Sequence, residues 1–453
     1  MNPASLFLVL ILFTAAWAQE PTPVEGEPEE MTLADRIWLS GQINIVNQSH
    51  PSFHASYSGP NSFRQGAEQA TTGVATIYTG FRLGRNTEFI LDLESARGAG
   101  VSGALGLGGL PNLDAVTDPT ATAAPYVARA LLRQTIAFTK KTEPATRNPL
   151  GLDPFLPATR LEIRVGKMSV TDFFDLNSIG SDSHLQFLNY AIDNNAAYDF
   201  AADSRGYSYG VLFEFYHPGW AARFAEMLEP TDPTGLTTNW NVTQSRSENY
   251  EIELNPNLIK DRSSIFRFNS FVNHADAASY EDAVNGYLSG HDPTPDLSAH
   301  LKRGLENFGF GVNGEQELTE SLRVFGRLGW NLGSKEAFQF AEADRTLALG
   351  ADSGGKRWHR DQDRIGLAMA INALSDAHRH YLELGGSSYL LGDNGLRYSR
   401  EKIFEGYYNF RLRHGVFLAF DLQHVRSPGY NANRGPVWIF GLRLHLEGEI
   451  HLE

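Results

Sequence analysis

The stretch Gly-Val-Phe-Leu-Ala-Phe-Asp-Leu-Gln-His-Val, residues 415–425, shows the pattern that decides the fold. Even positions from Val416 to Leu422 are all apolar, whereas the odd positions include Asp421 and Gln423. Successive side chains of a strand point to opposite faces, so this segment has one face suited to lipid and one suited to water. It predicts a strand in the wall of a transmembrane β-barrel.

The same alternation recurs along the chain in runs of about ten residues, the length of a strand that crosses a bilayer. In 207–215 every odd position is apolar or aromatic, and in 440–446 every even position is apolar. Sixteen runs are predicted to be strands: 36–48, 75–83, 88–96, 127–139, 160–168, 206–216, 220–228, 247–256, 263–274, 307–317, 321–332, 363–373, 379–388, 401–413, 415–425 and 436–447.

The connections between these runs alternate in length. Long connections are predicted at 49–74, 97–126, 169–205, 275–306 and 333–362, and short ones at 84–87, 217–219 and 414–415. Bacterial barrels have long extracellular loops and short periplasmic turns, and an even strand number places both termini in the periplasm. The segment 140–159 breaks the alternation, because it is long where a short turn is expected. We therefore predict an all-β, sixteen-stranded antiparallel transmembrane barrel.

Composition narrows the function. The 453 residues are 42% hydrophobic and 20% charged, with a net charge of −15 and no cysteine. The acidic balance argues against nucleic acid as a partner. The lack of cysteine excludes disulfides and cysteine chemistry. After the N-terminal region no run of about 18 apolar residues occurs, and a membrane protein without such helices must be a closed barrel.

The N-terminus has the features of a cleavable signal peptide, which we assign to residues 1–18. The run 6–13 is its apolar core, and Ala16-Trp17-Ala18 is a small-residue cleavage site. Residues 19–34 are rich in Pro and Glu and are expected to form a disordered leader. Residues 35–453 are then a single barrel domain in the outer membrane.

The faces opposite the apolar stripes carry many charges, which a dry interior could not hold unpaired but a water-filled lumen could. The candidates for pore lining and for contact with a hydroxyl-rich solute are Arg82, Asp92, Glu94, Arg133, Glu162, Arg164, Glu214, Arg327, Arg411, Asp421 and Arg443. Any one of them could equally serve only to solvate the lumen and pair with a neighbour.

The longest predicted connection, 169–205, combines acidic and aromatic residues, and a loop of this length has a function or is disordered. We interpret it as a constriction folded into the barrel, with an extracellular cap as the alternative. The constriction candidates are Asp172, Asp175, Asp193, Asp199 and Asp203.

Motifs for other chemistry are weak. The Gly-rich stretch 98–109 lacks the Gly-Lys-Ser/Thr of a phosphate-binding loop, and Asp361 with Asp363 is a poor signal for a glycosidase pair. His378 and His380 lack clustered metal ligands near them in sequence. No catalytic residue, metal site or cofactor is predicted.

Several blocks together resemble the carbohydrate-selective porins of the OprB family over nearly all the mature chain. Near the C-terminus they are Gly392-Asp393-Asn394-Gly395-Leu396, Pro428-Gly429-Tyr430-Asn431, Arg434-Gly435-Pro436 and Arg443-Leu444-His445. Upstream they are Arg164-Val165-Gly166-Lys167, Phe174-Asp175-Leu176-Asn177, Phe187-Leu188-Asn189, Asp203-Ser204-Arg205-Gly206-Tyr207 and Trp358-His359-Arg360-Asp361.

The resemblance implies a sixteen-stranded outer-membrane channel, not an enzyme, that admits glucose-like monosaccharides passively into the periplasm of a Gram-negative bacterium. Its partners would be small sugars, outer-membrane lipid and the barrel-assembly machinery. Two alternatives stay open: a general-diffusion porin without sugar preference, and a secreted carbohydrate-binding β domain. The sequence leaves open whether the barrel is a monomer or a homotrimer.

Overall fold

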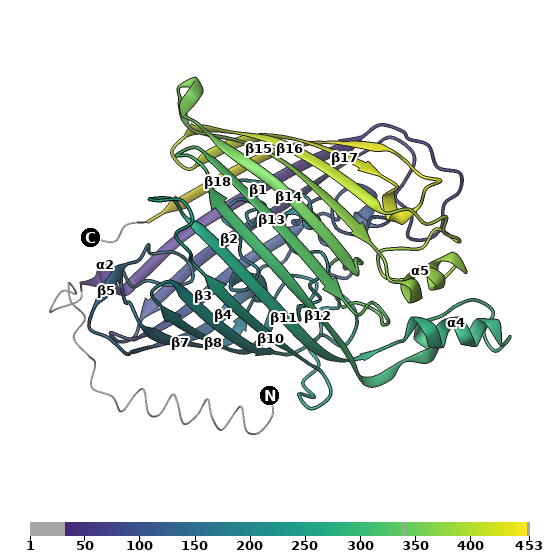
Figure 1. Cartoon of the computed structure of the whole chain (residues 1–453), viewed down its shortest axis with the longest axis horizontal. Helices are drawn as coiled ribbons and strands as arrows, with labels where there is room; N and C mark the ends of the chain where they lie inside the picture. The colour runs from purple at the N-terminus through teal and green to yellow at the C-terminus, as the bar shows by residue number, and fades with distance from the viewer. Residues whose placement is uncertain (1–31, 339, 451–453) are drawn as a thin grey trace.

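The computed structural model describes residues 32–338 and 340–450, and sixteen strands form a closed antiparallel barrel in it (Figure 1). The barrel strands are β1 (Ile37–His50), β2 (Glu68–Arg82), β3 (Thr87–Arg97), β4 (Tyr126–Ala137), β7 (Arg160–Met168), β8 (Ser208–His217), β9 (Trp220–Met227), β10 (Arg246–Leu254), β11 (Ser264–Ala277), β12 (Lys302–Glu317), β13 (Leu322–Asn331), β14 (Arg345–Gly355), β15 (Arg360–Ala373), β16 (Glu401–Arg413), β17 (Val416–Arg426) and β18 (Val437–Glu449). Each strand pairs with the next barrel strand in sequence, and β1 closes the barrel on β18. The predicted fold class is confirmed.

Alternation along the strands separates a lipid face from an inner face. Phe420, Phe440 and Leu442 point outward and are 54%, 51% and 43% exposed, whereas the neighbouring Asp421 and Arg443 are only 6% and 2% exposed. The apolar belt of a membrane barrel and its polar interior thus come from the same strands.

The strand predictions contain two errors: one predicted strand is partly a helix, and one strand was predicted as a loop. Residues 379–388 were predicted as a strand, but the first half of them belongs to helix α5 (Asp376–Glu383) and the rest to no strand. The helix begins where the Ser375 side chain accepts a hydrogen bond from the His378 amide. Strand β14 lies in the predicted loop 333–362. Its inward positions carry Thr346, Ala348 and Gly350 before Asp352, so the apolar–polar contrast is weak over the first half of the strand.

The barrel has two unlike ends (Figure 1). At the long-loop end lie helices α4 (Tyr280–Leu288) and α5; at the short-turn end lie α2 (Leu33–Arg36) and the separate hairpin of β5 (Thr142–Pro144) with β6 (Phe155–Pro157). The remaining short helices are η1 (Val101–Ala104), η2 (Val170–Asp172), α3 (Tyr190–Asp193), η3 (Ser298–His300), η4 (Lys356–Trp358) and η5 (Pro428–Tyr430).

In the part of the chain that the structure describes, no helix has the length and apolar character needed to cross a membrane. The predicted signal peptide, 1–18, lies outside the described residues, as does most of the predicted leader.

Two long loops fold into the barrel. The plug loop, residues 169–207, is buried there and is anchored where the backbone amides of Leu188 and Asn189 donate to Glu405 of β16 (2.5 and 3.1 Å). The second inner loop, residues 98–125, presents the Pro111 carbonyl, which accepts hydrogen bonds from Gln48 of β1 (3.0 Å) and Gln423 of β17 (2.8 Å). These two strands flank β18, so one carbonyl connects both sides of the strand that closes the barrel.

At the long-loop end the ring of His378 on α5 stacks on Tyr280 of α4, with ring centroids 4.2 Å apart. Burial alone would disfavour the charged imidazolium, but the carboxylates of Asp344 (3.2 Å) and Glu342 (3.6 Å) outweigh it and raise the pKa of His378 to about 9. At neutral pH the protonated imidazole therefore holds α5 to Glu342 and Asp344, in the position where its ring stacks on Tyr280 of α4.

The raised pKa predicts a pH dependence of this contact. A histidine whose pKa is higher in the folded state contributes stability that is full below pH 6.5 and lost as pH rises through about 9. We therefore expect proteases to cleave residues 278–301 and 374–400 of the wild-type protein faster as the pH is raised from 8 to 10. His378→Gln should remove this pH dependence. Equal cleavage of wild type at pH 7 and pH 10 would contradict the prediction.

Candidate functional site

The plug loop fills one side of the lumen because buried arginines of the barrel wall bind its backbone. Arg443 of β18 donates to the carbonyls of Ser183 (2.7 Å) and Gln186 (2.8 Å). Arg327 of β13 donates to the carbonyl of Ile192 (2.7 Å). These guanidinium groups hold the loop against β13 and β18, and the two cavities described next lie toward β2 to β9.

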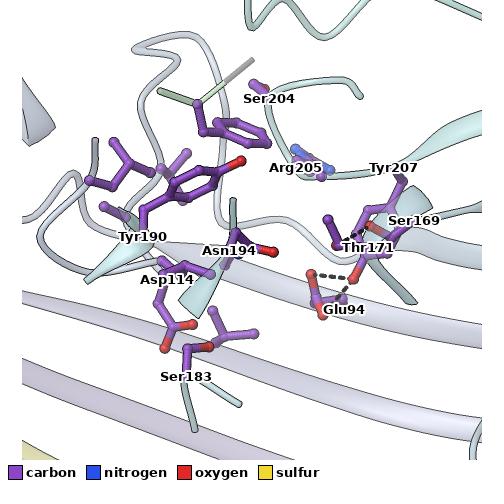
Figure 2. A pocket seen from close by; sticks show the side chains of 18 of the residues that line it. Glu94, Asp114, Ser169, Thr171, Ser183, Tyr190, Asn194, Ser204, Arg205 and Tyr207 are labelled. Carbon is purple, nitrogen blue, oxygen red and sulfur yellow. Dashed lines mark hydrogen bonds between the residues drawn. The ribbon is translucent and has the colours of Figure 1, made fainter. Parts of the chain in front are cut away.

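On that side a first cavity of about 220 Å³, here the upper cavity, lies between β2, β3 and the two inner loops. Figure 2 shows Tyr190 and Asn194 of the plug loop on one side of it, and Tyr207 with Glu94 on the other. The Glu94 carboxylate accepts hydrogen bonds from the hydroxyls of Tyr207 (3.2 Å) and Tyr126. One carboxylate thus fixes two aromatic rings in the wall of the cavity.

Charged groups of both signs complete the upper cavity. The Arg205 guanidinium lies 3.7 Å from the ring centroid of Tyr126, a cation–π contact. His184 and Asp114 line the cavity as a pair, with His184 Nε2 3.3 Å from the carboxylate. The cavity therefore offers aromatic faces together with hydrogen-bond donors and acceptors, which is how small-molecule sites fix orientation.

A second cavity of about 300 Å³, the lower cavity, lies nearer the short-turn end. The turn η2 divides the two cavities, because Thr171 lines the upper one and Asp172 the lower one. Arg129 of β4 fixes this turn: its Nε and Nη2 donate to the two oxygens of Asp172 (2.7 and 2.5 Å), and its Nη1 lies 3.2 Å from Asp92. Such bidentate pairs have a defined geometry.

The wall of the lower cavity belongs to a ladder in which arginine and glutamate alternate across neighbouring strands. For example, Glu162 lies between Arg133 (2.8 Å) and Arg164 (2.6 Å), and Arg164 also binds Glu214 (2.7 Å). The ladder runs through Glu88, Arg133, Glu162, Arg164, Glu214, Arg223, Glu251, Glu253, Arg267 and Glu315 on β3 to β12, with Arg160 beside Glu162. Opposite charges neutralise one another, while many donors and acceptors remain.

The predicted pore-lining residues have different surroundings. Ten of them are buried along the inner face of the wall, in ion pairs or hydrogen bonds: Arg82, Asp92, Glu94, Arg133, Glu162, Arg164, Glu214, Arg327, Asp421 and Arg443. Only Glu94, Arg133, Glu162, Arg164 and Glu214 among them line a cavity described above. Arg411 is half-exposed at the short-turn end, where it contacts Gln362. Sugar contact by any of them stays a prediction.

The predicted constriction residues of the plug loop also lie in different surroundings. Asp172 lies on the dividing turn, whereas the other four are buried in the plug loop. Asp175 pairs with Arg327 (3.1 Å), and Asp203 lies 3.4 Å from Lys167. Asp193 accepts from Asn194, and Asp199 accepts from Asn307.

Sequence reasoning missed Arg129, Tyr126 and Tyr207. Arg129 follows a β-bulge in β4, which shifts the alternation that would have marked it as inward-facing. Tyr207 was assigned to the apolar face of the strand 206–216, but β8 begins only at Ser208, so Tyr207 belongs to the plug loop.

A closed sixteen-stranded barrel with an apolar outer belt and polar cavities inside has the architecture of an outer-membrane channel. The sequence profile described as "Carbohydrate-selective porin, OprB family" matches residues 61–447. The chain therefore belongs to the OprB family of carbohydrate-selective porins and is a channel of the outer membrane.

The chain is similar to solved structures. The high-pH structure of Pseudomonas putida OprB shares the fold, with a TM-score of 0.69 at 15% identity, covering 92% of this chain and 95% of that chain. Acinetobacter baumannii OccAB1 has a TM-score of 0.46 at 10% identity, covering 91% of this chain and 97% of that chain. A search of curated proteins gave no match.

Proposed function

We propose that this porin selects glucose-like monosaccharides, which pass from the upper cavity over the dividing turn η2 into the lower cavity and the periplasm. The two cavities, about 220 and 300 Å³, are at or below the ~300–1,000 Å³ of pockets for drug-sized ligands. Their size suits a small solute, and they lie one on each side of η2, between the plug loop and the wall from β2 to β9.

The observation that carries the proposal is the lining of both cavities by paired charges beside aromatic rings. A sugar hydroxyl both donates and accepts, so it can bind a guanidinium and a carboxylate in turn. In the lower cavity the Arg164 guanidinium lies 4.9 Å from the ring centroid of Phe173, and Arg160 lies 4.0 Å from that of Tyr216. Because each charge already has a partner, sugar contacts are expected to be weak, as transport requires.

The test compares block of the single-channel current by glucose in wild type, Glu94→Gln and Arg164→Ala. Glu94→Gln alters the anchor of the upper cavity, and Arg164→Ala removes a donor from the lower cavity. Loss of one hydrogen bond costs about 0.5–1.5 kcal/mol, so the concentration for half-block should rise several-fold. Glu248→Gln, the same substitution on an outward-facing position of β10, is the matched control and should behave as wild type.

A general-diffusion porin would give another result. Its liposome swelling rates would follow solute size alone, with glucose no faster than a size-matched polyol that is not a sugar. If, in addition, neither substitution changes block by glucose, the proposed selectivity is wrong although the barrel remains a channel.

A further inference from the structure

One connection at the short-turn end departs from the rest. The link between β4 and β7, residues 138–159, contains the β5–β6 hairpin, whereas the other connections at this end range from two residues (414–415) to nine (255–263). The tip of this hairpin, residues 145–154, bends back into the mouth of the barrel. We call it the inturned segment.

The inturned segment packs into the interior through Leu152 and Asp153. Leu152 is fully buried against Gly80 of β2, where an added Cβ atom would lie 2.5 Å from its Cδ1. Its backbone amide donates to Glu88 of β3 (3.1 Å). Asp153 pairs with Arg82 at 2.5 Å, and both side chains are almost completely buried.

Contacts on two further sides fix the segment. Arg164 of β7 donates to the Leu150 carbonyl (2.9 Å). Arg147 donates to the carbonyls of Ala34 (3.0 Å) and Ile37 (3.2 Å) at the start of β1. The segment is thus bound to β1, β2, β3 and β7, and these contacts fix its position inside the lumen.

The inturned segment forms one wall of the lower cavity. Its lining residues are Ala145, Thr146, Asn148, Leu150, Gly151 and Asp153, and the facing wall is the arginine–glutamate ladder on β4, β7, β8 and β9. Asp153 is neutralised by Arg82, and Thr146 and Asn148 are exposed uncharged side chains. The segment therefore narrows the lower cavity without adding an unpaired carboxylate to it.

We propose that the inturned segment is the size-limiting wall of the channel at its short-turn end, and so a specificity-determining element of this porin. It restricts solutes of any chemistry by width, whereas the ladder supplies the hydrogen bonds. The inference does not rest on sugar selectivity, so it can fail or succeed independently of the proposed function.

The first test replaces residues 145–154 by Asn-Gly, which joins Pro144 to Phe155 through a two-residue turn and keeps the β5–β6 hairpin. We expect a several-fold higher single-channel conductance and faster entry of di- and trisaccharides into liposomes. The full chain is used, and heat-modifiable mobility on gels checks that the barrel has folded. A folded variant with wild-type conductance and size limit would overturn the proposal.

The second test does not need a deletion. The chain has no cysteine, so Asn148→Cys gives one thiol in the lower cavity and Glu143→Cys gives one on β5 that does not line it. A bulky anionic methanethiosulfonate added to the open channel should remove most of the current of Asn148→Cys. It should leave that of Glu143→Cys unchanged. Equal effects on the two variants, or none on Asn148→Cys, would overturn the proposal.

Discussion

Arg327→Met should release the plug loop from β13 and raise the single-channel conductance several-fold. The Arg327 side chain is only 1% exposed, donates to the carbonyls of Ile192 and Asp175, and pairs with the Asp175 carboxylate at 3.1 Å. Removing one partner of a buried ion pair costs about 3–5 kcal/mol, because the other charge is left without compensation. Movement of the loop away from the wall relieves that cost and widens the lumen.

Planar bilayer recordings measure the effect directly. Arg246→Met is the matched control, since Arg246 pairs with Glu248 on the outer surface and such pairs contribute little. The double variant Arg327→Met with Asp175→Asn should recover part of the wild-type conductance, because no buried carboxylate is then left unpaired. Wild-type conductance in the single variant would show that other contacts hold the loop.

The second large effect is expected on the outer face. Phe420 of β17 is 54% exposed at the centre of the lipid-facing row, and a charge near the bilayer midplane destabilises a barrel by about 2–4 kcal/mol. Phe420→Arg should therefore lower the free energy of unfolding by this amount, measured by urea titration in detergent or lipid vesicles.

The adjacent inward position provides the control. Asp421→Asn keeps an acceptor for the Gln423 amide (3.1 Å), so its stability should stay close to that of wild type. If both variants lose the same stability, the assignment of the two faces of β17 is wrong.

The strands were predictable because lipid outside and polar groups inside impose a strict alternation on residues such as Phe420 and Asp421. This contrast fades in the first half of β14, where the inward side chains Thr346 and Ala348 are small, and the strand was missed although Asp352 follows on the same face. Helix α5 was taken for a strand because it is short and its apolar residues, such as Tyr381 and Leu382, are few.

The site was predictable only in part. The charged residues of the ladder were visible in the sequence, but their pairing depends on the register between strands, which the sequence does not specify. The same holds for the contacts of the plug loop: Glu405 and Leu188 are 217 positions apart, so nothing local marks them as partners. The sequence therefore indicated a polar lumen but did not distinguish the arginines that hold the loop from those beside the cavities.

The Pro111 carbonyl has a consequence for assembly. Because it accepts from Gln48 on β1 and Gln423 on β17, its two hydrogen bonds form together only when the first and last parts of the chain have met. Insertion of the second inner loop and pairing of β1 with β18 should then occur together, in one cooperative step that joins residues far apart in sequence. Lateral separation of β1 from β18 would have to break contacts inside the lumen as well as those between the strands, so the inner loop stabilises the closed barrel.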